Sequence, residues 1–206
     1  CFSLVRRSVE RSRATTQRFN VVACFCRGGY ARRVAAGLVL SALGDALLVW
    51  PQHFVAGMAA FALAHVAYIA AFRWAPRAAM LGGALYIATC AFLSVVSPPA
   101  GLRALVPLYA LLLATMAWRG AARGGAAAPG ALLFLVSDAI LGYSLFGGPV
   151  PYNQVLVMST YYLGQLGIAL SALASVEEAR PAAAARPSAP HTLRDTSPRV
   201  ACSDSM

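Results

Sequence analysis

Charged residues are almost absent from the long central part of this chain, and that absence constrains the fold more than any other feature. Between Val34 and Ser175 the charged residues are Arg73, Arg77, Arg103, Arg119, Arg123, Asp45 and Asp138. Over the whole chain 12% of residues are charged and 59% are hydrophobic, whereas soluble domains carry about 25% charged residues. A water-soluble fold could not cover its surface with so few charges. The sequence therefore excludes a soluble globular enzyme and predicts a polytopic membrane protein.

Six apolar segments predict an all-α transmembrane helix bundle. A spanning helix needs about 20 apolar residues, with ~17 tolerated, and none of the segments alternates apolar and polar residues as a spanning strand would. Helices then satisfy the backbone hydrogen bonds within the lipid. The six predicted spans are 34–50, 54–72, 78–97, 104–118, 130–146 and 153–174. The linkers are short, so we expect neighbouring helices to run antiparallel.

The arginines predict how the bundle is oriented. One side carries both arginine-rich termini and the linker residues Arg73, Arg77, Arg119 and Arg123, whereas the other side has Arg103. The positive-inside rule then places both termini in the cytosol. The net charge of +10 lies at the ends of apolar runs and not on one face of a folded domain, so we expect a membrane and no nucleic acid as the partner. The sequence leaves a homo-oligomer open.

The chain divides into three predicted regions. Residues 1–30 form a basic, poorly ordered segment, and residues 31–175 form the transmembrane bundle. Residues 176–206 are rich in Pro, Ala and Ser, which predicts a disordered cytosolic tail.

A weak internal repeat relates two of the predicted helices. The motifs LGDALL (43–48) and VSDAIL (136–141) share the pattern apolar, small, Asp, Ala, apolar, Leu. The two segments are four helices apart and so run in the same direction. This pattern favours a parallel duplication that places the two aspartates at equivalent positions.

The two aspartates are the acids at membrane depth, where inserting each one costs about 2.5 kcal/mol or more. An ionisable residue in such a place is by default a functional-site hypothesis. At 1.5 Å per residue, the polar side chains of several helices fall about 8 to 16 Å from the lumenal helix ends. We therefore predict one polar layer, with Asp45 and Asp138 as catalytic residues and with His65, Tyr109, Tyr161 and Tyr162 as substrate-pocket candidates.

Each of these residues has an alternative structural role. The aspartates could be carboxyls hydrogen-bonded to a neighbouring helix, or part of an ion pathway. His65 could be a buried core histidine, with Tyr68 one turn along the same helix as its partner. Tyr161 and Tyr162 cannot share one helix face, so at most one of them lines a central cavity. No pair of histidines has metal-ligand spacing, and we expect neither a metal site nor a cofactor.

A stripe of small residues precedes the first aspartate. Gly37, Ser41 and Gly44 stand at four- and three-residue spacing. Small residues at this spacing let two helices approach closely in a membrane. We expect the helix that carries Asp45 to pack tightly against a neighbour.

Four separated motifs resemble the YhhN-like family of lysoplasmalogenase-type transmembrane proteins, and its animal members in particular. The first is SALGDALLVWPQHFVAGMAAFALAHVAYIAAF over 41–72. The others are LLLATMAWRG (111–120), GALLFLVSDAIL (130–141) and TYYLGQLGIALSAL (160–173), in the order of the family. The resemblance covers about residues 28–174. The two motif aspartates of the family correspond to Asp45 and Asp138.

The resemblance implies hydrolysis of the vinyl ether bond of 1-alkenyl lysophosphatidylcholine or lysophosphatidylethanolamine in the endoplasmic reticulum membrane. The products would be a fatty aldehyde and glycerophosphocholine or glycerophosphoethanolamine. Such a bond breaks when its β-carbon is protonated and water captures the oxocarbenium ion. Two neighbouring carboxyls in a low-dielectric site do not both ionise easily. We expect one aspartate to donate the proton and the other to stabilise the cation and activate water, in an order that the sequence does not assign.

The resemblance also implies about eight spanning helices. The first of them and most of the second have no counterpart among the residues before Tyr30, where Gly28-Gly29-Tyr30 resembles the end of the second. The rival function is a proton-coupled transporter or a lipid-binding membrane protein, in which the same acids relay protons or bind a cation. A purely structural role for the acids predicts that Asp-to-Asn changes are silent.

Overall fold

In the computed structural model, the structure describes residues 29–73 and 78–184 of the chain. The predicted basic segment therefore lies outside the described residues except for its last two, which are helical. Of the predicted tail, residues 185–206 lie outside the described residues as well. Residues 176–184 continue the last helix, so ordered structure extends beyond the predicted boundary at residue 175.

Within these ranges the chain folds into six α-helices with no strand between them. They are α2 (Gly29–Leu48), α3 (Phe54–Phe72), α4 (Ala79–Val95), α5 (Leu105–Arg123), α6 (Ala127–Phe146) and α7 (Asn153–Ala184). Short 3₁₀ turns at Pro51–His53 and Ala100–Leu102 precede α3 and α5. The predicted all-α bundle is thus confirmed.

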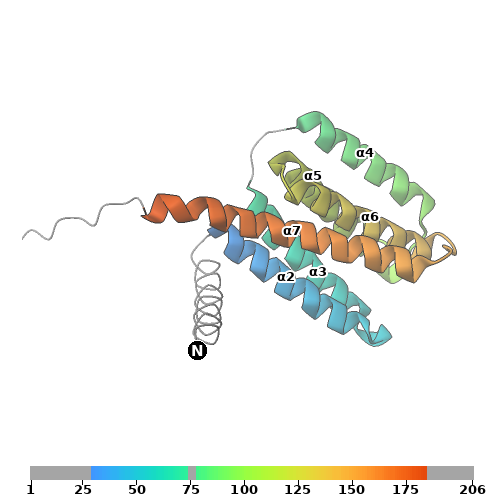
Figure 1. The fold of residues 1–206 in the computed structure, drawn as a ribbon. Helices are drawn as coiled ribbons and strands as arrows, with labels where there is room; N and C mark the ends of the chain where they lie inside the picture. Colours follow the sequence, from blue (N-terminus) through green and yellow to red (C-terminus); the bar gives the residue numbers. More distant parts are fainter. Residues whose placement is uncertain (1–28, 74–77, 185–206) are drawn as a thin grey trace, which may run out of the picture.

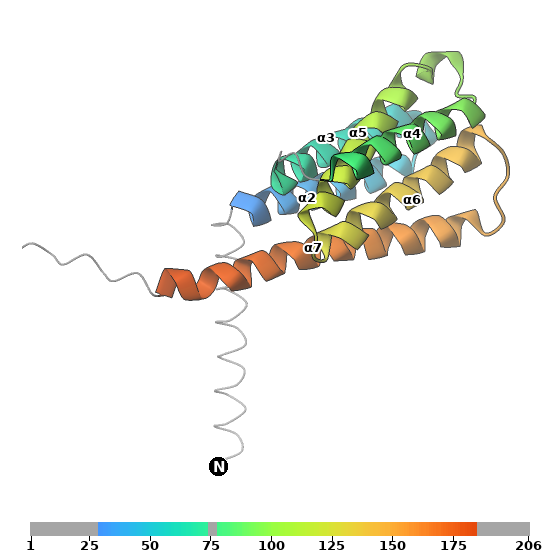
Figure 2. The ribbon, with the colours of Figure 1, turned by 90° about the horizontal axis from the view of Figure 1, so that it is seen from above.

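The helices run up and down, and each is joined to the next at alternate ends of the bundle (Figure 1). The start of α2 and the end of α7 lie at the same end, together with the end of α3, the start of α4 and the α5–α6 turn. Helix α4 lies at the outer edge of the bundle in Figure 1 and comes to the front, over α5, in the view from above (Figure 2), and its closest packing is against α5. The remaining helices form the main body, in which α2 pairs with α3 and α6 with α7.

Four of the described helical segments are long and apolar enough to cross a membrane. They are Pro51–Phe72, Ala100–Arg123, Ala127–Phe146 and Asn153–Glu178, and the apolar helix Ala79–Val95 is shorter. Helix α2 contains Arg32, Arg33 and Asp45, which dilute its hydropathy. Large apolar side chains such as Val39, Met80 and Ile87 point outward, as lipid-facing residues do. The chain is a multi-pass helical membrane protein.

The connection between α5 and α6 is much shorter than the sequence predicts. Helix α5 continues to Arg123, five residues past the predicted end at 118, and α6 begins at Ala127 instead of 130. Pro129 therefore lies inside the first turn of α6, where its missing N–H leaves no helical hydrogen bond unmade. Gly124 and Gly125 make the turn with φ values of 82° and 57°, a conformation that glycine adopts at little cost.

Glycines bring the paired helices into close contact. Gly37 and Gly44 of α2 lie directly against the rings of Tyr68 and Phe61 of α3, which is the tight packing predicted from the small-residue stripe. Between α6 and α7 the backbones themselves meet, because a Cβ at Gly130 would stand 2.7 Å from the backbone nitrogen of Ile168. These contacts fix how far the aspartate-bearing helices α2 and α6 stand from their partners.

Candidate active site

A cavity of about 410 Å³ opens between the helices, and both aspartates line it. Its volume lies within the range of about 300–1,000 Å³ that is usual for small-molecule sites. Most of the wall is made by Leu, Phe, Ala, Met and Val side chains contributed by all six described helices. Polar groups on this wall include the carboxyls of Asp45 and Asp138 and the hydroxyls of Tyr109 and Tyr161. We call it the acid cavity.

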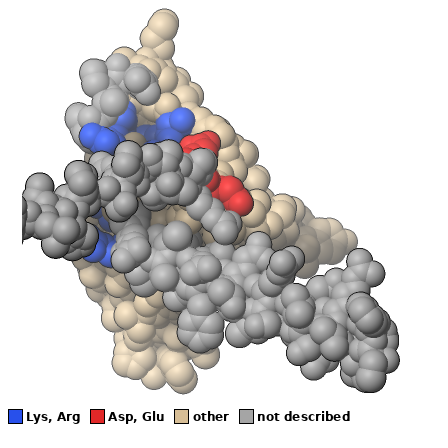
Figure 3. All heavy atoms as spheres, turned by 60° about the vertical axis from the view of Figure 1, so that its left-hand side comes forward, with Lys and Arg blue, Asp and Glu red and all other residues tan. Residues whose placement is uncertain are grey.

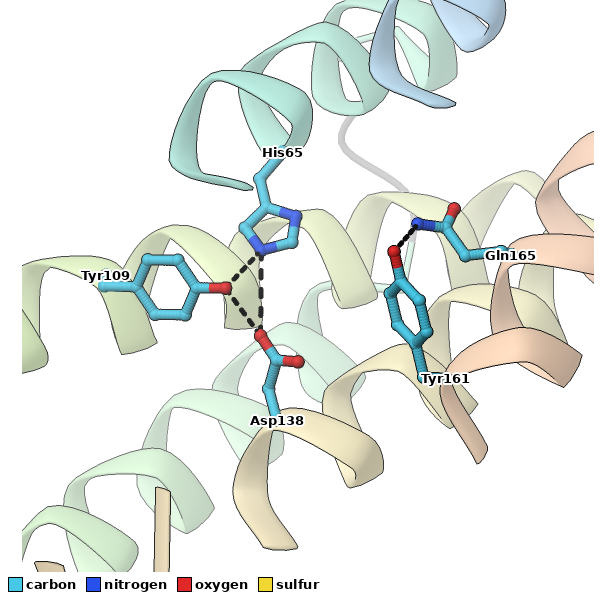
Figure 4. A network of polar contacts seen from close by, with 5 residues as sticks. All are labelled: His65, Tyr109, Asp138, Tyr161 and Gln165. Atoms are coloured by element: carbon cyan, nitrogen blue, oxygen red, sulfur yellow. Dashed lines mark hydrogen bonds and ion pairs between the residues drawn. The ribbon is translucent and has the colours of Figure 1, made fainter. Parts of the chain in front are cut away.

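Asp138 belongs to a chain of three polar side chains from three helices (Figure 4). The hydroxyl of Tyr109, on α5, donates a hydrogen bond of 2.6 Å to Asp138 Oδ2. His65 Nε2, on α3, lies 3.1 Å from the same hydroxyl oxygen and 3.9 Å from Asp138 Oδ2. The Asp138 side chain is 14% exposed and the imidazole is fully buried behind Tyr109. The imidazole of His65 therefore does not line the cavity itself, because the Tyr109 hydroxyl and the Asp138 carboxyl lie between them.

Asp45 ends a second chain of polar side chains. The hydroxyl of Tyr161, on α7, donates to Asp45 Oδ2 at 2.8 Å. Gln165, one turn further along α7, donates its amide N–H to that hydroxyl oxygen at 3.1 Å, as Figure 4 shows. The hydroxyl of Tyr68, on α3, donates to Gln165 Oε1 at 2.8 Å. Four residues from three helices therefore form one continuous hydrogen-bonded line.

Aromatic rings pack between the two chains of polar side chains and keep them apart. The ring of Phe134 packs edge-on against His65, with centroids 5.1 Å apart, and against Tyr161, at 5.3 Å. Phe61 meets Tyr161 in the same T-shaped manner at 6.0 Å. Such contacts add about 0.5–1.5 kcal/mol each beyond burial. The polar groups are thus positioned by a rigid apolar frame.

The structure brings five of the six predicted site residues together. Asp45, Asp138, Tyr109 and Tyr161 line the acid cavity, and His65 stands directly behind it. Tyr162 does not join them: its side chain is 62% exposed because it is one residue away from Tyr161 and so points about 100° around the helix. This outcome agrees with the expectation that at most one of the two tyrosines faces a central cavity.

The partner that the sequence offered as an alternative for His65 is not the one found, and one residue was missed. Tyr68 bonds Gln165, and the partner of His65 is Tyr109 on another helix. Gln165 was overlooked in the sequence, although it stands four residues after Tyr161 and therefore on the same helix face. A polar amide within an otherwise apolar span was the available signal. Within residues 29–73 and 78–184, no three His, Cys, Asp or Glu side chains gather as metal ligands would.

On the α4 side the acid cavity is closed by side chains alone. Leu85, Ala88 and Phe92 of α4 face Leu141 and Gly142 of α6 across it, and the Phe92 ring lies against Gly142. Helix α4 packs its backbone most closely against α5, so side chains alone close the space towards α6. This wall, which we call the α4–α6 wall, separates the cavity from the surrounding lipid.

The site can carry out acid–base chemistry on an apolar molecule. Each carboxyl has one oxygen held by a tyrosine hydroxyl, and both carboxyls face the same cavity. A carboxyl in such surroundings can donate a proton to a bound molecule, and a second carboxylate can stabilise the cation that forms. The apolar lining suits a long hydrocarbon chain.

Comparison with known proteins gives a consistent picture. The sequence pattern of the YhhN family matches residues 19–172. The chain is 45% identical over 150 residues to "Lysoplasmalogenase TMEM86B" of Homo sapiens and 44% identical over 147 residues to that of Sus scrofa, matches that cover 72% and 70% of this chain. It is 38% identical over 167 residues to "Lysoplasmalogenase TMEM86A" of Homo sapiens, a match covering 71% of this chain and 68% of the relative.

The matched part of the chain spans 66% and 65% of the lengths of the two TMEM86B relatives. Both aspartates and all five clustered residues lie inside the range matched by the family pattern. No solved structure matches the chain.

Proposed function

This chain belongs to the YhhN family, and on that premise we propose that it is a lysoplasmalogenase. It hydrolyses the vinyl ether bond of 1-alkenyl lysophosphatidylcholine or lysophosphatidylethanolamine, an ether hydrolase reaction. The observation that carries the proposal is the pair of carboxyls on the wall of one apolar cavity at membrane depth. Relatives bearing the name lysoplasmalogenase support the choice of substrate.

The reaction requires one proton, one water molecule and a place for positive charge. A carboxyl transfers its proton to the β-carbon of the C=C–O group, and the double bond becomes an oxocarbenium ion stabilised by the other carboxylate. Water loses a proton to that carboxylate and adds to the cationic carbon, which gives a hemiacetal. The hemiacetal then breaks its bond to the glycerol oxygen, which takes up the proton that the water gave to the second carboxylate, while the hemiacetal hydroxyl returns a proton to the carboxylate that donated first. A fatty aldehyde and a glycerophospho compound are released, and both carboxyls are back in their starting states.

Asp138 is the proton donor in this proposal. The groups behind it, the hydroxyl of Tyr109 and the imidazole of His65, can each both accept and donate a proton. The distances of 2.6 and 3.1 Å let Tyr109, backed by His65, hold the Asp138 carboxyl in place and stabilise the carboxylate that is left when it gives up its proton. Low exposure of Asp138 favours the uncharged, protonated carboxyl.

Asp45 is the stabilising anion and the base for water. The amide of Gln165 donates through nitrogen and accepts through oxygen, so it does not pass a proton along. Because Gln165 donates to Tyr161 and accepts from Tyr68, the Tyr161 hydroxyl is left to donate to Asp45. A hydrogen bond donated to a carboxylate stabilises its ionised form.

The test replaces each carboxyl by its neutral isostere. D45N and D138N, in the full chain reconstituted in phospholipid, should each lower aldehyde release from lysoplasmalogen by about 10²–10⁴-fold, the usual contribution of one acid or base. Y162F changes an exposed residue and serves as the matched control with unchanged activity. An alkyl-ether lysophospholipid, which lacks the double bond, should not react.

Isotopes test the chemical course. In D₂O one deuterium should appear at carbon 2 of the aldehyde, because the β-carbon takes its proton from the enzyme. In H₂¹⁸O the glycerophospho product should carry no label, since the water attacks the alkenyl carbon. Label in the glycerol, or full activity of both Asn variants, would reject this mechanism, and ion flux without aldehyde would favour a transporter.

We propose further that all six described helices span the endoplasmic reticulum membrane and that the α2–α3 and α6–α7 pairs are the two halves of a parallel repeat. A helix of 20 residues is about 30 Å long, which matches the hydrocarbon thickness. Arg73, Arg119 and Arg123 stand at one end and Arg103 at the other, so the positive-inside rule places the C-terminus in the cytosol.

The orientation is tested with an acceptor site for N-glycosylation. A site placed in the 147–152 loop should be glycosylated in microsomes, and one placed after residue 184 should not. The reverse pattern would overturn the orientation without touching the chemistry of the acid cavity.

A further inference from the structure

A second cavity lies at the end of the bundle that carries the α5–α6 turn. The proposed reaction does not use this part of the molecule. The cavity has a volume of about 620 Å³ and is formed by the ends of α3 and α5, the α5–α6 turn and the last turns of α7. Its charged lining residues are Arg73, Arg119, Arg123 and Glu178. We call it the arginine cavity.

We propose that the arginine cavity is a binding site for a phosphate group, separate from the site of vinyl ether hydrolysis. Its three guanidinium groups against one carboxylate give the described lining a net charge of +2. Arginine side chains gather over this end of the molecule, beside acidic ones (Figure 3). Guanidinium groups match the oxygens of a phosphate better than any other cation in proteins.

The arginines are held in place by the fold. Arg119 is 2% exposed and donates from Nε and Nη2 to the carbonyl oxygen of Arg73, at 3.2 and 2.7 Å, which fixes the end of α3. The guanidinium carbon of Arg123 lies 3.6 Å from the ring centroid of Tyr30. This stacking contact orients the planar guanidinium group and leaves its positive charge in place. The exposed side chain of Arg73 completes the set.

The neutral hydroxyls in this region already have partners. Ser171 Oγ donates to the carbonyl oxygen of Ile168 and lies 2.6 Å from the Tyr30 hydroxyl, and Ser175 Oγ donates to that of Ala172. The turn residues 124–126 line the cavity, but Ala128 and Gly130 at the start of α6 already donate to the carbonyls of Gly125 and Ala126, so the arginines are the donors that matter for a ligand. The cavity thus offers charged donors from several directions.

The ligand of this cavity is not the headgroup of the molecule being hydrolysed. Tyr109 lines the acid cavity and Arg119 the arginine cavity, and ten residues of α5 between them span about 15 Å. Only the three glycerol carbons separate the vinyl ether from the phosphate of a lysoplasmalogen. One molecule therefore cannot place its vinyl ether between the aspartates and its phosphate in the arginine cavity.

The phosphate can come from a membrane lipid or from a soluble compound. A cavity among the ends of membrane helices lies at the depth of lipid headgroups, and the same donors suit a free phosphomonoester. The experiment therefore has two arms. The full chain in phosphatidylcholine nanodiscs is titrated with sn-glycerol 3-phosphate. In parallel it is placed in phosphatidylcholine nanodiscs that contain phosphatidate, with discs in which diacylglycerol replaces the phosphatidate as the control without a phosphomonoester.

Thermal midpoint and bound lipid, counted by native mass spectrometry, are the readouts. We expect stabilisation by phosphatidate, and by glycerol 3-phosphate as well if the headgroup alone suffices. R73Q removes an exposed side chain while its structural carbonyl stays, so it should weaken binding about 10-fold, the usual effect of losing a hydrogen bond to a charged group. R123K keeps the positive charge but lacks the planar guanidinium group, so it should weaken phosphate binding less than R123Q does.

The control is R103Q, which removes an exposed arginine at the opposite end of the bundle and should bind as the unaltered chain does. Aldehyde release by R73Q in phosphatidylcholine should be unchanged, so the outcome is independent of the proposed hydrolysis. Absence of binding in both arms, or equal loss in R103Q and R73Q, overturns the proposal.

Discussion

A tyrosine hydroxyl stands beside each carboxyl of the acid cavity, but the groups behind the two tyrosines differ. Behind Tyr109 is an imidazole, and behind Tyr161 is an amide. A neutral imidazole has one nitrogen that donates a hydrogen bond and one that can take up a proton, whereas an amide nitrogen does not take one up. Two similar-looking carboxyl–phenol pairs are therefore suited to different tasks, one to supply protons and one to hold negative charge.

Removing the phenol between Asp138 and His65 tests this difference. Y109F should lower kcat for aldehyde release by about 10–100-fold, because the Tyr109 hydroxyl donates to the Asp138 carboxylate that forms as the proton leaves, and a hydrogen bond to a charged group contributes about 1.5–3 kcal/mol. The solvent isotope effect on kcat should rise, since proton transfer from Asp138 becomes slower. Y86F removes a hydroxyl bonded to Thr115 at 2.7 Å, away from the acid cavity, and should leave both quantities unchanged.

The individual site residues could be predicted from depth along the helices, but their partners could not. Asp45, Asp138, Tyr109 and His65 stand out because polar groups are rare in apolar spans. Pairing depends on how each helix is rotated against its neighbours, which is set by contacts such as Gly37 against the Tyr68 ring. The sequence offered Tyr68 as a possible partner of His65, whereas the rotation of the helix turns Tyr68 to Gln165.

At the scale of the helix, the distance between α6 and α7 depends on three glycines. Gly130, Gly164 and Gly167 face one another, and a Cβ at Gly164 would stand 2.9 Å from the backbone nitrogen of Phe134. Phe134 is the ring that separates the two polar chains. The close approach of these helices therefore also determines where Asp138 and Tyr161 stand.

Side chains introduced at these glycines should separate the helices. G130V or G164V should destabilise the chain by about 1–3 kcal/mol through overpacking, measured as a lower thermal midpoint in detergent, with aldehyde release falling in parallel. G83V is the matched control, because Gly83 lies in α4 with no atom within 4 Å of its Cβ position. A midpoint of G83V as low as that of G164V would contradict the packing argument.

Element order and type follow from the sequence because apolar length alone predicts a membrane helix. Helix ends do not follow as well, since the Ala- and Gly-rich stretch between α5 and α6 contains no strong stop signal before Gly124. Arg119 illustrates the reason: its hydrogen bonds to the Arg73 carbonyl belong to the helical bundle, whereas the sequence suggested a loop.

At the scale of the whole molecule, the six helices enclose the acid cavity unevenly. Five form the main body, and α4 closes the remaining side at the outer edge (Figure 1). The α4–α6 wall is made by side chains with little backbone packing behind them. A hydrocarbon chain in the acid cavity would therefore lie against the side chains of α4 on this side.

Filling the cavity from α4 tests its role. Ala88 lines the acid cavity, whereas Ala91 of the same helix does not. A88W should raise the KM for a long-chain alkenyl substrate by about 10-fold, because apolar chain burial worth about 0.8 kcal/mol per CH₂ is lost, and should affect a short-chain substrate less. A91W should behave as the unaltered chain does, and equal effects of the two would count against the cavity as the chain's binding site.

The α4–α6 wall also bears on the fate of the product. A long-chain aldehyde that passed between these side chains would enter the hydrocarbon of the bilayer directly. The reactive carbonyl would then stay in the same bilayer that supplied its precursor, whereas the glycerol fragment is soluble in water and would leave by a different route.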